Sequence, residues 1–210
     1  MILIYAFSNQ WGTNISRRVL LELQKLLSKS PLSQPEADPP LAEKEGKGFS
    51  FEFIHFHPRT FYKKYIEHNI YSLIIGLGDG PKYIEKIKIE TQAKNAYNDQ
   101  SIYPFAPILI DLNIPVIDNF NSDYFKISSN MGTYNCNWIA FSTQLYLNQN
   151  NLNTSHLFFH LPPQIQRLHF IQPNSGVIIS ESPNIILSSL WRTDDEILKP
   201  NLYFFIRKTR

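Results

Sequence analysis

The chain's single cysteine, Cys136, and a histidine inside an apolar run, His160, are the residues best suited to do chemistry. Cys136 follows a strand-like segment, 125–127, and a tight turn that contains Gly132. Apolar residues from Trp138 onward recur at helical spacing, so we expect Cys136 in the first turn of a helix. Unpaired N–H groups and the helix dipole stabilise a thiolate there. The position predicts a nucleophile, whereas residue statistics alone favour a buried, inert cysteine.

His160 interrupts the apolar stretch 157–161, which Pro162 and Pro163 close. An imidazole buried in such a strand needs a hydrogen-bond partner, because burial of an unpaired polar group costs a few kcal/mol. Two interpretations remain open: a structural histidine that is hydrogen-bonded in the core, or a base beside the helix that carries the thiol.

Two other patterns give weaker signals. His55 and His57 share one face of a predicted strand, but no third metal ligand lies nearby, so we expect surface or packing histidines and no metal site. The loop 76–80 has three glycines and follows a buried strand, which predicts a ligand-bordering loop. Pro81 replaces the last glycine of the dinucleotide fingerprint, so no nucleotide cofactor is expected.

Composition limits the class of protein. The 210 residues suit one domain with a substantial core, and 43% of them are hydrophobic, as in a globular protein. A net charge of +2 predicts neither nucleic acid nor a membrane surface as a partner. A single cysteine is compatible with a reducing compartment, and no signal peptide or transmembrane run is found. We therefore expect a cytoplasmic protein.

The order of elements predicts an α/β fold. An apolar strand, 1–7, precedes an amphipathic helix that starts at Ile15, and this is the opening of an α/β unit. Residues 29–48 are rich in Ser, Pro, Glu and Lys and are predicted to form a mobile insertion within a single domain that spans 1–210. Further strands are predicted at 49–56, 71–75, 84–90, 107–111, 114–117, 157–161 and 176–180, with apolar runs at 185–190 and 202–206.

Four segments together resemble pyroglutamyl-peptidase I, the pyrrolidone-carboxylate peptidases of family C15. The segment 128–137, SSNMGTYNCN, matches the family's cysteine motif with Met131 in place of an alanine. Phe159-His160-Leu161-Pro162 has the form of its histidine motif, and Glu90-Thr91-Gln92-Ala93-Lys94-Asn95 keeps the Glu, Ala and Asn of its glutamate motif. The N-terminal strand, Trp11-Gly12 and Asn14-Ile15-Ser16 look like an eroded form of its first loop.

The resemblance implies a single-domain, three-layer α/β/α fold with a mixed, mostly parallel twisted sheet. It also implies a thiol peptidase with a catalytic triad of Cys136, His160 and Glu90. The substrates would be peptides with an N-terminal pyroglutamate, no cofactor or metal would be needed, and the protein would form a dimer or tetramer. By position, the residues that match the family's substrate pocket are Phe7, Trp11, Asn14, Leu77 and Tyr134.

Departures from the family pattern keep alternatives open. Ala6 stands where the family has a glycine, the first loop lacks its proline and second phenylalanine, and the stretch between Glu90 and Cys136 is short. The alternatives are a thiol hydrolase that acts on another N-terminal amide or lactam, and a non-catalytic binding protein that keeps the fold.

Overall fold

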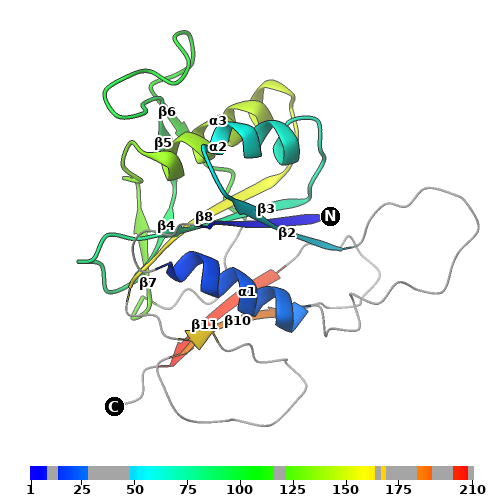
Figure 1. Ribbon diagram of the computed structural model, residues 1–210, viewed down its shortest axis with the longest axis vertical. Coiled ribbons are helices and arrows are strands. Elements are labelled where there is room, and N and C mark those ends of the chain that lie inside the picture. Colours follow the sequence, from blue (N-terminus) through cyan, green and yellow to red (C-terminus); the bar gives the residue numbers. More distant parts are fainter. Residues whose placement is uncertain are drawn as a thin grey trace, which may run out of the picture.

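A six-stranded mixed sheet forms the centre of the protein (Figure 1). The structure, a computed structural model, describes residues 1–8, 14–27, 48–115, 122–163, 167–168, 184–190 and 201–207. The strands of the central sheet are β1 (Ile2–Phe7), β2 (Phe49–Ile54), β3 (Leu73–Asp79), β4 (Ile87–Glu90), β7 (Phe125–Ser128) and β8 (Ser155–Leu161).

The order of the strands is β2-β1-β3-β8-β4-β7. The pairings β1–β2, β1–β3, β3–β8 and β4–β7 are parallel, whereas β4 and β8 run antiparallel. This confirms the predicted α/β class with a mixed, mostly parallel sheet. The antiparallel pair puts the start of β4 beside the carboxyl end of β8.

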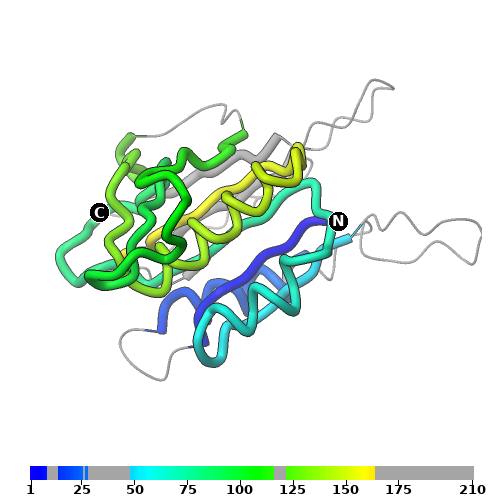
Figure 2. The backbone as a smooth tube through the Cα atoms, turned by 90° about the horizontal axis from the view of Figure 1, so that it is seen from above, coloured from blue at the N-terminus to red at the C-terminus, as the bar shows by residue number. Residues whose placement is uncertain are grey.

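Helices cover both faces of the sheet. On one face lie α3 (Asn135–Gln149), the short α2 (Pro58–Phe61) and a π-helical turn, η2 (Tyr62–Ile66). Figure 2 looks onto this face, with α3 and the α2–η2 segment in front of the strands. On the other face lies α1 (Ile15–Leu27). A three-stranded sheet of β9 (Arg167–Leu168), β10 (Asn184–Leu190) and β11 (Asn201–Arg207) follows, and β9 contacts α1.

The alternation of side chains along the strands divides the core into two clusters. Leu157, Phe159 and Leu161 pack toward α1. Phe158 of the same strand packs toward α3, in the cluster that contains Trp138 and Phe141. Because successive residues of a strand point to opposite faces, His160 must share the α3 face with Phe158.

Two predicted strands differ from the structure. The expected buried strand 107–111 is the three-residue β6 (Leu109–Asp111), which pairs with β5 (Gln92–Lys94) outside the central sheet and leaves Leu109 exposed. The predicted strand 114–117 is wrong over its described part, 114–115. Asn113 just before it donates its N–H to Gln144 on α3 and accepts one from His156, so these groups bond to α3 and β8.

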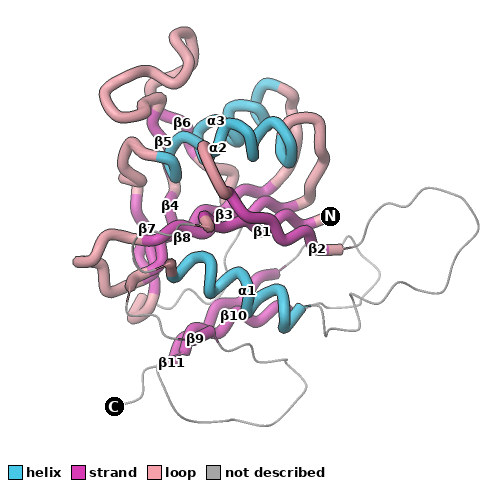
Figure 3. Tube along the Cα trace, viewed as in Figure 1, coloured by secondary structure: helices cyan, strands magenta, loops and turns pink. Residues whose placement is uncertain are grey.

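Other predictions fall wholly or partly outside the described residues. These are the insertion 29–48, described only at Gly48, and the strand 176–180. The apolar runs at 185–190 and 202–206 lie within β10 and β11. The long loop between β5 and β6 projects beyond α3 (Figure 3).

Gly76 on β3 is required by close packing. A Cβ at this position would lie 2.5 Å from a ring carbon of Phe158 and 2.6 Å from Tyr5 Oη. Replacement of Gly76 by alanine should lower the free energy of unfolding by about 1–3 kcal/mol, because two buried aromatic rings must shift.

Urea denaturation measures this effect, and Gly48→Ala is the matched control, since nothing lies within 4 Å of its added Cβ. The control should change the free energy of unfolding by no more than about 0.5 kcal/mol. Equal effects of the two substitutions would contradict the packing argument.

His156 on β8 is a fully buried histidine whose Nδ1 lies 3.2 Å from Gln144 Oε1. Burial lowers the pKa of this imidazole to about 3. The unfolded chain therefore binds more protons than the folded protein between the two pKa values, about 6.5 and about 3. The free energy of unfolding should fall as the pH drops below about 6.5, by up to about 1.4 kcal/mol per pH unit.

Denaturation midpoints from pH 7 to pH 5 measure this slope. His156→Gln should lose its share of the slope, whereas His55→Gln, at an exposed position, should keep it. Parallel curves for the wild type and His156→Gln would rule out a buried neutral imidazole.

Candidate active site

The candidate site lies where the carboxyl ends of β3 and β8 meet the N-terminus of α3. Gly78 of β3 is in register with His160 of β8, and Cys136 stands in the first turn of α3 above them. The three elements come from distant parts of the chain: parallel pairing brings β3 beside β8, and hydrogen bonds from Asn137 join α3 to the β5 segment. The expected position of Cys136 at the start of a helix is confirmed.

The N-terminus of α3 is free of a side-chain cap. Tyr134 is the N-cap residue and its side chain makes no capping hydrogen bond. The N–H groups of Asn135, Cys136 and Asn137 therefore have no partner within the helix. The half-buried thiol of Cys136 lies next to these donors at the positive end of the helix dipole.

His160 and Glu90 form a buried pair across the antiparallel strands. Nδ1 of His160 lies 2.8 Å from Oε1 of Glu90, and the Glu90 side chain is fully buried. With Nδ1 directed at the carboxylate, Nε2 is the ring nitrogen that remains for Cys136. By itself Glu90 would be taken for a solvated charge at a strand end, and the structure contradicts that interpretation because β4 packs it against β8.

The pKa of His160 is set by opposing influences. Burial, the largest single influence, lowers the pKa of the imidazole, but hydrogen bonds and charge attraction from Cys136 and Glu90 together outweigh it and raise the pKa to about 9. The imidazole of His160 is thus mainly protonated at neutral pH.

Gly78 provides the space for the thiol. A Cβ at this position would lie 2.9 Å from Cys136 Sγ and 3.1 Å from Cδ2 of His160. The segment 76–80, predicted as a loop, instead continues β3 as far as Asp79, because it pairs with β1 and β8 in the sheet. The backbone at Gly78 approaches the thiol without a side chain between them.

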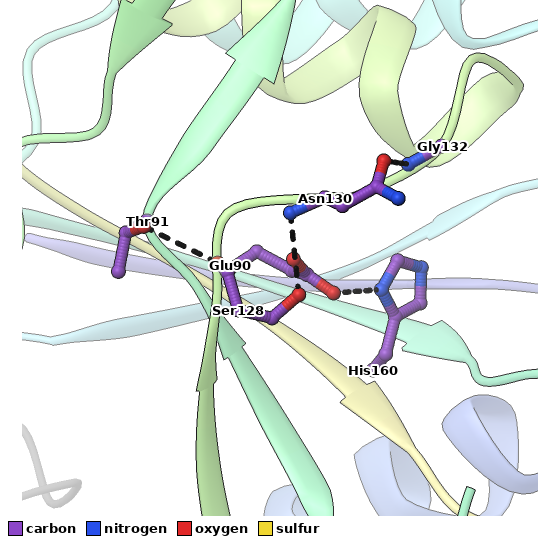
Figure 4. A network of polar contacts seen from close by, with 6 residues as sticks. All are labelled: Glu90, Thr91, Ser128, Asn130, Gly132 and His160. Atoms are coloured by element: carbon purple, nitrogen blue, oxygen red, sulfur yellow. Dashed lines mark hydrogen bonds and ion pairs between the residues drawn. The ribbon is translucent and has the colours of Figure 1, made fainter.

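Hydrogen bonds hold the segment that connects β7 to α3 (Figure 4). The Ser128 carbonyl accepts from the Thr91 N–H at 2.7 Å, and Asn130 donates its N–H to Ser128 Oγ. The Asn130 side chain in turn accepts from the N–H of Gly132, which has a φ of 85°. The turn predicted at 130–132 is present, and it directs the chain into α3.

Two asparagines of the recognised motifs have a structural role that the sequence did not reveal. Asn137, fully buried, accepts from the Lys94 N–H and donates to the carbonyls of Lys94 and Ala96. Asn95 bonds in a similar way to Tyr103 and Ala106. Their places in the glutamate and cysteine motifs were the only sequence signal that singled out Asn95 and Asn137. They fasten α3 and the long loop to β5.

Tyr5 is a neighbour of the site that sequence reasoning missed. It is fully buried, and its hydroxyl has no hydrogen-bond partner in the part of the chain that the structure describes. Burial raises the pKa of this phenol well above its usual value, and the negative charge of Cys136 adds to the effect. Nothing in an apolar strand distinguishes Tyr5 from a core residue, so no sequence signal could have found it.

The structure brings only part of the predicted pocket to the site. Phe7 is buried on the α3 face, and Tyr134 is 71% exposed at the start of α3. The Leu77 side chain packs toward α1, so only its backbone borders the site face. Asn14 precedes α1 with a φ of 53° and is half-buried. Trp11 lies outside the described residues.

Asp79 at the end of β3 anchors the start of α1. Its Oδ1 accepts from the Ser16 N–H at 2.8 Å and its Oδ2 from the Ile15 N–H at 3.3 Å. A carboxylate at a helix N-terminus is stabilised by the unpaired N–H groups and the dipole. This contact fixes the start of α1 next to the end of β3.

Across the described ranges, no group of three or more His, Cys, Asp or Glu side chains could hold a metal ion. The same residues contain no helix that is long and apolar enough to cross a membrane.

Comparison with known proteins supports the fold. No protein-family model and no curated protein matches the chain. Among solved structures it is similar to the pyrrolidone carboxyl peptidase of Thermococcus litoralis, with a TM-score of 0.56 and 21% identity over 77% of this chain and 76% of that one.

The pyrrolidone carboxyl peptidase of Fervidobacterium islandicum has a TM-score of 0.53, and a mutant form of the Pyrococcus furiosus enzyme has one of 0.54. Each is 16% identical over 77% of this chain and 80% of its own. At these identities the likeness establishes a common fold, which is that of the pyrrolidone carboxyl peptidases.

Replacement of Glu90 by glutamine should lower the pKa of His160 from about 9, because burial then acts against a weaker opposing attraction. NMR titration of the His160 imidazole measures this change in pKa. Glu22→Gln, at a surface ion pair with Lys25, is the control and should leave the titration unchanged. A His160 midpoint that stays near 9 in Glu90→Gln would show that the carboxylate does not govern the imidazole.

Proposed function

We propose that the protein is a cysteine peptidase that removes N-terminal pyroglutamate from peptides. The observation that carries this proposal is the line of contacts from Cys136 through His160 to the buried Glu90, at an uncapped helix N-terminus. A fold like that of the pyrrolidone carboxyl peptidases supports the choice of substrate.

In the resting site the proton of the Cys136 thiol is held on Nε2 of His160, so the nucleophile is a thiolate paired with an imidazolium. The resulting imidazolium is stabilised by Glu90 through Nδ1, and the thiolate is stabilised by the N-terminus of α3. Glu90 also fixes the orientation of the ring, since its 2.8 Å contact leaves Nε2 toward the sulfur.

The thiolate then attacks the carbonyl carbon that joins the pyroglutamyl residue to the next amino acid. The oxygen gains the negative charge, and the N–H groups of Cys136 and its helical neighbours stabilise it, an effect worth about 3–4 kcal/mol per donor in other enzymes. When the C–N bond breaks, His160 gives its proton to the leaving amine. A thioester of Cys136 and a shortened peptide result.

Water completes the reaction. The neutral His160 takes a proton from water as the water attacks the thioester carbonyl, and the C–S bond breaks. Pyroglutamate leaves, and the thiolate and the imidazolium are restored. Every proton that is transferred passes through His160, which is why its hydrogen bond to Glu90 matters in both halves of the reaction.

A pyroglutamyl ring is flat and uncharged, so an aromatic wall with a few backbone partners suits it. We propose that Phe7 and Tyr134 contribute this wall, that the backbone at Leu77 supplies a polar partner, and that Asn14 and Trp11 complete the first loop.

Hydrolysis of a pyroglutamyl-coumarin substrate tests the proposal. Cys136→Ala should lower kcat by about 10⁴-fold or more, because the nucleophile is removed. Wild-type protein treated with iodoacetamide should lose activity to the same extent. Turnover that persists in Cys136→Ala would reject the thiol mechanism.

The same assay separates the alternatives. Absent turnover together with rapid alkylation of Cys136 at mildly acidic pH would indicate a thiol hydrolase for another N-terminal amide. Absent turnover with a thiol of ordinary reactivity would indicate a non-catalytic protein.

A further inference from the structure

Two lysines lie on the next two strands beyond His160, at positions in register with it. His160 on β8 is in register with Lys88 on β4, and Lys88 is in register with Lys126 on β7. Gly78, beneath the thiol, is in register with His160 on the other side. Gly78, His160, Lys88 and Lys126 therefore form one row across four adjacent strands.

The lysines point to the same face as the site. Ile87 and Ile89 of β4 and Phe125 of β7 pack toward α1, and the residues between or next to them must point the opposite way. Glu90 confirms this direction for β4, because it reaches His160 and lies two residues from Lys88. We name Lys88 and Lys126 the basic pair.

The basic pair is unfavourable in the free protein. Like charges directly opposite each other on neighbouring strands destabilise a sheet. The ion pairs found in the described part of the chain, Lys25–Glu22 and His160–Glu90, involve neither lysine. Glu90, two residues from Lys88 on the same face, is directed at His160. Two unneutralised cations thus stand next to the site.

The surface over β4 and the edge strand β7 is hollowed. A hollow of about 700 Å³ is lined by both lysines together with Lys86, Tyr83 and Ile127. Lys86 donates to the Ser122 carbonyl, and Glu85 is the one acidic residue among the described residues that line the hollow. The balance of charge there is positive, and there is room for part of a peptide.

The spacing suits the part of a substrate that follows the scissile bond. Neighbouring strands lie about 4.8 Å apart, so the Cα atoms of Lys88 and Lys126 lie about 10 Å and about 14 Å from that of Gly78. An extended peptide advances about 3.5 Å per residue. The lysine side chains can therefore reach groups one to three residues beyond the amide that Cys136 attacks.

We propose that the basic pair is a subsite for a carboxylate carried by the leaving peptide. This inference rests on the proposed peptidase function. The carboxylate is either an acidic side chain or a free C-terminus, because both present the same anionic group to two ammonium groups.

The first experiment does not depend on peptidase activity. It compares the rate of alkylation of Cys136 by anionic iodoacetate with the rate for neutral iodoacetamide at low salt. Lys88→Gln/Lys126→Gln should lower the ratio of the two rates by about three- to tenfold, since two positive charges near the thiol are lost. The difference should shrink in 0.5 M salt.

The control is Lys63→Gln/Lys64→Gln on η2, which removes the same net charge from a helical segment outside the row. It should leave the ratio of rates unchanged. A ratio in the basic-pair variant equal to that of the wild type overturns the proposal, whether or not the protein hydrolyses pyroglutamyl peptides.

The second experiment compares kcat/KM for pyroglutamyl-Ala-Glu-amide, pyroglutamyl-Ala-Gln-amide and pyroglutamyl-Ala-Gln with a free C-terminus. A preference for the first over the second identifies a side-chain carboxylate, and one for the third identifies the C-terminus. Either preference should disappear in Lys88→Gln/Lys126→Gln but not in the control.

The two proposals fail in different ways. Turnover of all three peptides without preference overturns the subsite and leaves the peptidase standing. Absent turnover with a changed alkylation ratio overturns the peptidase and supports a basic subsite next to the thiol.

Discussion

The hydrogen bond between Glu90 and His160 is the interaction on which the site depends. A fully buried carboxylate is costly unless it is paired, and here its partner is an imidazole whose other nitrogen is left for a thiol. The antiparallel pairing of β4 with β8 brings the two together, because it sets Glu90 in register with Phe158, two residues before His160. The antiparallel ladder of the central sheet, β4 with β8, therefore brings Glu90 to His160.

Close backbone approach is the second constraint. Gly76 leaves room for Tyr5 and Phe158, and Gly78 leaves room for the thiol and the imidazole. The two glycines lie on the same face of β3. The aromatic side chains and the reactive groups therefore pack directly against the backbone of this strand. Asn137 makes two hydrogen bonds to Lys94 of β5 and one to Ala96 just after it, and these contacts fix the position of α3 and of Cys136 over the sheet.

Local patterns were sufficient for much of the fold. The apolar run 2–7 and the periodicity of 15–27 predicted β1 and α1, and the turn at Gly132 followed by Trp138 predicted the start of α3. The pattern failed between 107 and 115, where the side chain of Gln144 on α3 and the N–H of His156 on β8 bond to the backbone of Asn113. It also gave no reason to single out Tyr5, whose hydroxyl is unusual only because of what surrounds it.

The sequence by itself determined the identity and order of the reactive groups and the elements that carry them, because helix starts and buried strands depend on neighbouring residues. Only the tertiary structure decided that Glu90 is buried against His160, that the Leu77 side chain points away from the site, and that Lys88 and Lys126 continue its row. These facts depend on strand order, direction and register, which arise from pairing between segments far apart in the chain.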